Sequence, residues 1–174
     1  MTTNPDVRLR FRVLKTRGGW AGFVTGPEGL RRCYLPEASE DALRARVAAD
    51  HPEARENARL EPALAAQLRD YLRGRPVEFD VTIDWEGSGL TGFQRRVYAE
   101  LLRTGRGETL TYGELARRAG RPGAARGVGT AMARNPYPPI VPCHRVLGSD
   151  GSLRGYSGPG GLALKTRLLE IEGS

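Results

Sequence analysis

One stretch decides the organisation of this chain, NPYPPIVPCHR at residues 135–145. Four prolines within eight residues cannot continue a helix, so the helical pattern that precedes residue 135 must end there. The same prolines stiffen the approach to Cys143. A rigid loop that delivers a thiol is what the positioning of a nucleophile requires.

Cys143 is a candidate nucleophile because His144 follows it directly. A cysteine reacts as the thiolate, and a nearby base favours that form. Adjacent side chains point apart on a helix or strand, so these two groups could pair through a bridging water or a bend in the chain. A Cys-His pair taken alone more often has a structural role, and a structural role is also assigned to Cys33, which lies in a predicted strand.

Two short helices are predicted immediately before this stretch. Residues 111–114, Thr-Tyr-Gly-Glu, form a capping box that opens the first helix, and Gly-Arg-Pro-Gly at residues 120–123 ends it. A second helix is predicted over residues 124–133, which gives the outline of a helix-turn-helix. Its side chains are mostly small, with Arg126 and Arg134 among them; such a helix suits either close approach to a groove or tight packing inside the domain.

Towards the N-terminus the pattern is that of strands and helices in one α/β unit. Hydrophobic residues alternate over residues 7–13, and short strands are predicted around residues 20–24 and 30–35, which together make an antiparallel meander. Ser39 caps a predicted helix and Pro62 opens another. A last strand is predicted over residues 77–85, and the small residues of 86–89 mark a boundary between domains 1–86 and 87–174.

The charge of the chain lies in its second part. Residues 1–86 carry 14 basic and 14 acidic side chains, whereas residues 87–174 carry 13 basic and six acidic ones, so the net charge of +7 belongs to the second part. Such an excess favours an anionic partner such as nucleic acid, although a solvated basic face has the same composition. The two cysteines lack metal-site spacing and no long apolar run occurs, which predicts a cytoplasmic protein without a membrane span.

Several segments together resemble one known family. They are Asn135-Pro136, PIVPCHRV at residues 139–146, GYSG at residues 155–158 and LLEIEG at residues 168–173, and they are similar to the O6-alkylguanine-DNA alkyltransferase family. The resemblance implies an α+β fold, with a small ribonuclease-H-like α/β domain followed by a helical, winged helix-turn-helix-like domain. It also implies irreversible, stoichiometric transfer of an alkyl group from O6 of guanine to a cysteine of the protein.

The resemblance assigns roles to four residues of the reactive centre. Cys143 is the expected alkyl acceptor, and His144 is expected to take its proton through a water molecule. Glu172 is expected to orient His144, and Asn135 to bridge the two helical elements near the site.

The resemblance also implies how the substrate is held. Tyr112 is expected to donate a hydrogen bond to the guanine ring, the backbone amide of Ser157 to reach O6, and the carbonyls of Cys143 and Val146 to read the guanine amino group. Without the motif, Tyr112 would be interpreted as a packing aromatic and Ser157 as a turn residue.

The expected partner is double-stranded DNA that carries O6-alkylguanine. Because O6 lies inside the stacked duplex, the nucleotide must rotate out, and the resemblance assigns the filling of its place to Arg126. The second helix is expected in the minor groove, where small residues allow close approach. The DNA-contacting residues expected on it and at its end are Ala125, Arg126, Gly127, Thr130 and Arg134.

Neither half shows a Cys/His cluster for a structural zinc, so no metal and no cofactor is predicted. The protein is expected to act as a monomer, with cooperative binding on DNA left open. Three alternatives compete with this interpretation: a cysteine hydrolase built on Cys143 and His144, a module that binds alkylated guanine without repairing it, and a regulatory helix-turn-helix protein. The last two give no chemical role to Cys143, and the hydrolase gives no role to the basic half.

Overall fold

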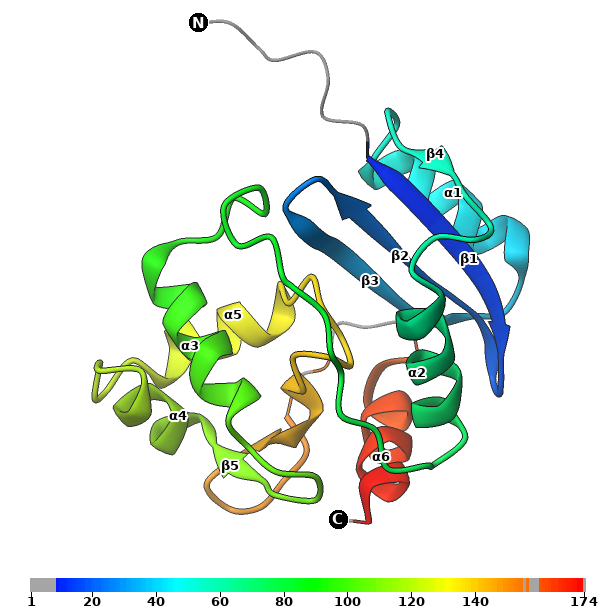
Figure 1. Ribbon diagram of the computed structural model, residues 1–174. Coiled ribbons are helices and arrows are strands. Elements are labelled where there is room, and N and C mark those ends of the chain that lie inside the picture. The colour runs from blue at the N-terminus through cyan, green and yellow to red at the C-terminus, as the bar shows by residue number, and fades with distance from the viewer. Residues whose placement is uncertain (1–8, 155, 157–159, 174) are drawn as a thin grey trace, which may run out of the picture.

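An antiparallel meander opens the computed structural model, which describes residues 9–154, 156 and 160–173 (Figure 1). Its strands are β1 (Arg10–Thr16), β2 (Gly19–Gly26) and β3 (Gly29–Glu37). The short β4 (Arg55–Glu56) pairs in parallel with β1, and the strand order is β3-β2-β1-β4. The predicted meander is therefore confirmed. Gly19 is required at its first turn, since a Cβ there would lie 2.2 Å from the Glu37 carbonyl oxygen.

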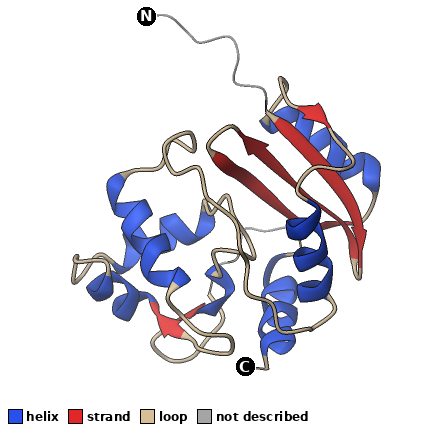
Figure 2. Ribbon diagram, in the orientation of Figure 1, coloured by secondary structure: helices blue, strands red, loops and turns tan. Residues whose placement is uncertain are grey.

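Two helices cover opposite faces of this sheet (Figure 2). Neighbouring residues of β2 point to opposite faces, so Phe23 packs in the core with α2 (Pro62–Leu72) and Val24 packs with α1 (Glu40–Asp50). The predicted starts of both helices are confirmed. Ser39 Oγ accepts a hydrogen bond from the amide of Ala42, and Pro62 occupies the first turn of α2.

The prediction of a strand over residues 77–85 was wrong. This segment is extended, but it forms only one bridge, in which Ile83 pairs with Leu30 of β3. Its apolar side chains face the core while most of the polar ones face outward, so burial alternates as in a strand although no ladder forms. Asp84 is an exception: it is buried, forms an ion pair with Arg31 at 2.9 Å and accepts from the amide of Gly87 at 2.7 Å.

The second part of the chain is mainly helical, as predicted. It contains α3 (Gly92–Leu102), α4 (Tyr112–Arg118) and α5 (Ala125–Ala133), with β5 (Leu110–Thr111) paired in parallel to β6 (Val146–Leu147). The capping box predicted at the start of α4 is confirmed, because the Thr111 and Glu114 side chains each bond the other residue's backbone amide.

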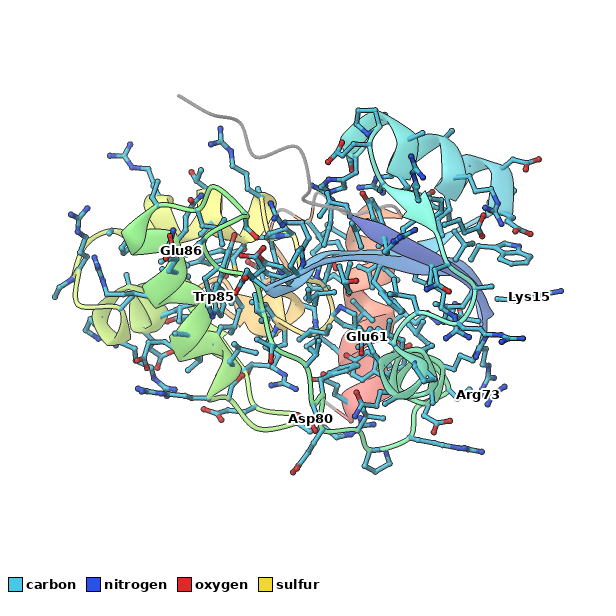
Figure 3. All side chains as sticks on the ribbon, turned by 45° about the horizontal axis from the view of Figure 1, so that its top comes forward. Lys15, Glu61, Arg73, Asp80, Trp85 and Glu86 are labelled. Atoms are coloured by element: carbon cyan, nitrogen blue, oxygen red, sulfur yellow. The ribbon has the colours of Figure 1, made fainter. Side chains whose placement is uncertain are left out.

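The two parts of the chain share one hydrophobic core. A single cluster contains Phe23 and Cys33 of the sheet together with Tyr98 of α3 and Val128 of α5. The C-terminal helix α6 (Gly161–Glu172) packs beside α2 of the first part, as Figure 1 shows. Figure 3 shows Asp80, Trp85 and Glu86 along the connecting segment, with side chains filling the space that it crosses. The division into domains 1–86 and 87–174 stays a prediction.

Candidate active site

The loop before Cys143 is held in shape by Asn135. The Asn135 side-chain amide donates to the carbonyl of Val141 at 2.7 Å, and its oxygen accepts from the amide of Tyr137 at 2.9 Å. The loop is also tied to the sheet, because the amide of Cys33 in β3 donates to the carbonyl of Pro136 at 2.8 Å. Asn135 thus fixes the approach to the short helix η1 (Cys143–Arg145).

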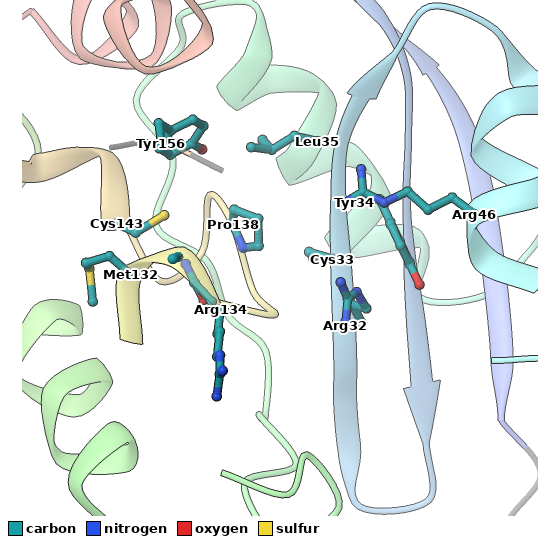
Figure 4. A pocket seen from close by; sticks show the side chains of 12 residues that line it. Arg32, Cys33, Tyr34, Leu35, Arg46, Met132, Arg134, Pro138, Cys143 and Tyr156 are labelled. Carbon is teal, nitrogen blue, oxygen red and sulfur yellow. The ribbon is translucent and has the colours of Figure 1, made fainter. Parts of the chain in front are cut away.

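Cys143 lies at the start of η1 with 4% of its surface exposed, and its side chain points into the space between this loop and β3 (Figure 4). The pocket there has a volume of about 90 Å³. It is lined by Arg32, Cys33, Tyr34, Leu35, Arg46, Met132, Ala133, Arg134, Asn135, Pro138, Cys143 and Tyr156. The contribution of β3 was not foreseen, since strand patterning does not reveal which distant loop a strand edge meets.

Burial raises the pKa of the Cys143 thiol, because the thiolate is poorly solvated there. The polar side chains of Asn135 and Tyr156 beside the thiol, and the positive charge of Lys165, oppose this increase in the pKa without cancelling it. The resting thiol is therefore protonated at neutral pH, and attack by Cys143 requires a base.

His144 and Glu172 form a pair that is sealed from solvent. The distance from His144 Nε2 to Glu172 Oε1 is 2.9 Å, and both side chains have zero exposure. Arg145 binds the same carboxylate through both oxygens, at 2.7 Å from Nε and 3.0 Å from Nη2. The structure thus brings together the histidine and the carboxylate that the sequence predicted as partners.

The carboxylate determines which form His144 adopts. Burial lowers the pKa of His144, whereas the hydrogen bond to Glu172 opposes the decrease, and the imidazole is neutral at rest. Burial opposes the ionisation of Glu172, yet hydrogen bonds from His144, Arg145 and Tyr71 hold the pKa of Glu172 below its ordinary value. Because an ionised Glu172 accepts, Nε2 carries the proton, and the buried Nδ1, which has no partner within the described residues, is free to accept one.

Tyr71 of α2 contacts this pair, and its role was not predicted from the sequence. Its hydroxyl donates to Glu172 Oε1 at 2.8 Å and lies 3.2 Å from His144 Nε2. The only signal was a tyrosine on the apolar face of a predicted helix, which ordinarily indicates packing alone.

Lys165 is a second site residue that was not predicted, and it links Val146 to the neighbourhood of Tyr112. Its buried Nζ donates to the carbonyl of Val146 at 2.6 Å and to the carbonyl of Arg154 at 3.1 Å. The Tyr112 hydroxyl donates to the same Arg154 carbonyl at 3.1 Å. Two of the expected substrate-contacting groups are thus held next to each other, while the expected contact from Ser157 lies outside the described residues.

The residues expected to contact DNA fall into two groups on and beside α5. Arg126, Thr130 and Arg134 are exposed and four residues apart, so they share one face. Ala125 is half-buried at the first position of the helix. Gly127 faces inward, where a Cβ would lie 3.1 Å from a ring carbon of Phe93 in α3. The small size of residue 127 therefore already serves helix packing.

Comparison with known proteins gives the site its context. A family model for the 6-O-methylguanine DNA methyltransferase DNA binding domain matches residues 92–174. A methylated-DNA–protein-cysteine methyltransferase of Mycolicibacterium paratuberculosis is 47% identical over 117 residues, which cover 67% of this chain and 68% of the relative. The chain belongs to the methylated-DNA–protein-cysteine methyltransferase family. The matched part of this family member contains Cys143, His144 and Glu172.

Other relatives define how far the similarity extends. A methylated-DNA–protein-cysteine methyltransferase of Mycobacterium tuberculosis is 51% identical over 108 residues, but this match spans only 62% of either chain. A crystal structure of Mycobacterium tuberculosis OGT in complex with DNA superposes with a TM-score of 0.78 at 37% identity, covering 94% of this chain and 92% of that one. The α+β fold of this methyltransferase family member thus extends over its N-terminal part as well.

Within the described residues, no three His, Cys, Asp or Glu side chains are grouped so as to hold a metal ion. No helix in this part of the chain is long and apolar enough to span a membrane.

Proposed function

We propose that this protein repairs O6-alkylguanine in double-stranded DNA by moving the alkyl group irreversibly onto Cys143. The observation that carries the proposal is the Cys143 thiol facing a pocket while the neighbouring His144 is paired with the buried Glu172, in a chain of this family. The Mycobacterium tuberculosis relative has been crystallised with DNA, which favours the same partner here.

The chemistry is a displacement at the alkyl carbon. The thiol proton passes through a water molecule to the free Nδ1 of neutral His144, and Glu172 stabilises the imidazolium that results. The thiolate then attacks the alkyl carbon in line with the C–O6 bond. A sulfur–carbon bond forms, the C–O6 bond breaks, and the electron pair leaves with guanine, whose ring then takes a proton. No cofactor is needed because every electron pair is accounted for.

We assign recognition of the base to groups around Lys165. The carbonyls of Cys143 and Val146 would accept from the guanine amino group, and Lys165 holds the second of these carbonyls in place. Tyr112 would donate to the ring by leaving the carbonyl of Arg154. The amide of Ser157 would reach O6, and these donors favour departure of guanine as negative charge develops on it.

We assign DNA binding to a helix-turn-helix formed by α4 and α5. The exposed face of Arg126, Thr130 and Arg134 would enter the minor groove, with Ala125 at its edge. Arg126 would fill the space left by the rotated nucleotide. Contacts with phosphates account for the excess positive charge of residues 87–174.

The finer architecture belongs to the same proposal. Residues 1–86 would form a ribonuclease-H-like domain and residues 87–174 a winged helix-turn-helix-like domain, joined through the shared core. The protein would act as a monomer.

Reaction stoichiometry tests this proposal against the hydrolase alternative. A fixed amount of protein is mixed with a tenfold excess of duplex that contains one O6-methylguanine, and the repaired duplex is counted over time. The proposal predicts that repair stops at one duplex per protein molecule. Continued turnover, or no repair at all, would contradict it.

A further inference from the structure

The first part of the chain contributes a side chain to the reactive centre. Tyr71 belongs to α2, 101 residues away from Glu172 in the sequence, yet its hydroxyl donates to Glu172 Oε1 at 2.8 Å. The family model matches only residues 92–174, so this contact comes from outside the matched region.

The geometry makes Tyr71 and His144 share one acceptor. Glu172 Oε1 receives the phenol of Tyr71 and the Nε2–H of His144, while the phenol oxygen lies 3.2 Å from the same Nε2. A phenol has one proton to donate, and in Tyr71 this proton is hydrogen-bonded to the Glu172 carboxylate. The hydroxyl oxygen can therefore only accept from His144, which fixes Nε2 as the protonated nitrogen of the ring.

Packing holds the phenol in this place. Tyr71 has 3% of its surface exposed, and its ring packs against Phe79 with centroids 5.6 Å apart. The same helix packs against α6 through Leu72 and Leu168. A shift of α2 relative to α6 would thus change the hydrogen bonding of Glu172 directly.

We propose that Tyr71 is a positioning residue of the acceptor site, which holds Glu172 Oε1 and keeps His144 neutral with Nδ1 free. The inference rests on the proposed function. By donating to Oε1, the phenol withdraws part of the negative charge that would otherwise favour the imidazolium. The groups that face His144 are Tyr71 from α2, Glu172 and Lys165 from α6, and Arg145 from η1. Of these, Tyr71 alone comes from the first part of the chain.

Tyr71→Phe tests the proposal because it removes the hydroxyl and keeps the ring. The chain has only two histidines, so NMR titration of the imidazoles follows His144 with His51 as an internal reference. The variant is expected to titrate His144 at a higher pH than the wild type, with His51 unchanged. Transfer from free O6-benzylguanine to Cys143 at neutral pH should slow roughly tenfold, a part of what a positioned base contributes.

The matched control is Leu72→Val, which trims the neighbouring buried residue of α2 without touching the pair. Unchanged His144 titration in Tyr71→Phe, or an equal shift in Leu72→Val, would overturn the proposal. The wild type supplies a check that needs no variant: its nitrogen-15 spectrum must show His144 protonated at Nε2 at neutral pH, and protonation at Nδ1 would overturn it too.

The NMR titration needs no DNA, so it separates the two claims. If Tyr71→Phe shifts His144 while the wild type transfers no alkyl group from DNA, the positioning role stands and the proposed function fails. If the wild type repairs DNA and His144 does not shift, the reverse holds.

Discussion

Arg145 and Glu172 form an ion pair in which two guanidinium nitrogens reach the two oxygens of one carboxylate, at 2.7 and 3.0 Å. The Glu172 side chain has no exposure and the Arg145 side chain has 11%. Arg145 also donates to the carbonyl and the hydroxyl of Thr104, at 2.6 and 2.8 Å. Arg145 therefore joins η1 to α6 and to the residues that directly follow α3.

Arg145→Met should destabilise the fold strongly. The change leaves Glu172 charged and buried without its main counterion, a situation that costs about 3–5 kcal/mol of unfolding free energy. Urea unfolding measures the difference. Arg103→Ala is the control, because that exposed arginine also forms an ion pair and its loss should change stability by about 0.5 kcal/mol or less. Similar losses of unfolding free energy in the two variants would show that the buried ion pair stabilises the fold no more than the exposed one.

The stability of the wild type should decrease as the pH falls below 6.5. Burial lowers the pKa of His144 below its ordinary value of 6.5, so in this range the unfolded chain binds a proton that the folded protein does not. Stability then increases with pH, with a slope of at most about 1.4 kcal/mol per pH unit for one group. His51 shifts in the same direction, so the informative measurement is the difference between wild type and His144→Gln. Urea unfolding between about pH 5 and 7 should give a smaller slope for the variant; equal slopes would refute this origin.

Arg126→Ala should separate DNA opening from chemistry. Arg126 is exposed on α5 and lies outside the pocket that contains Cys143. If it fills the space of the rotated nucleotide, its loss slows transfer from duplex DNA about tenfold or more while transfer from free O6-benzylguanine is retained. Arg103→Ala removes one positive charge elsewhere and corrects for the general loss of DNA affinity. Equal slowing on both substrates by Arg126→Ala would argue against this role.

Local signals in the sequence predicted much of the fold. Ser39, Pro62 and the Thr111–Glu114 capping box mark helix starts through contacts within a few residues, and all three are confirmed. The extended segment 77–85 was misread because alternating burial does not require a pairing strand. Here the segment covers the core and forms one isolated bridge with β3, between Ile83 and Leu30, instead of a ladder.

The same difference between local and long-range contacts decided which residues of the site could be predicted. The pairing of His144 with Glu172 was predicted from the motif, whereas Tyr71 and Lys165 became visible only in the structure. Both residues reach the site through helix packing over long sequence distances, and a buried tyrosine or lysine has no local pattern that reveals its partner.

Alkyl transfer to Cys143 is tested most directly by the mass of the Cys143 peptide after reaction. Protein is mixed with duplex DNA containing a single O6-methylguanine, and the masses of the Cys143 peptide and of the DNA are measured by mass spectrometry. We expect one added methyl group on Cys143, an equal loss from the DNA, and no repair by Cys143→Ala. An unmodified Cys143 beside repaired DNA, or repair by Cys143→Ala, would contradict it.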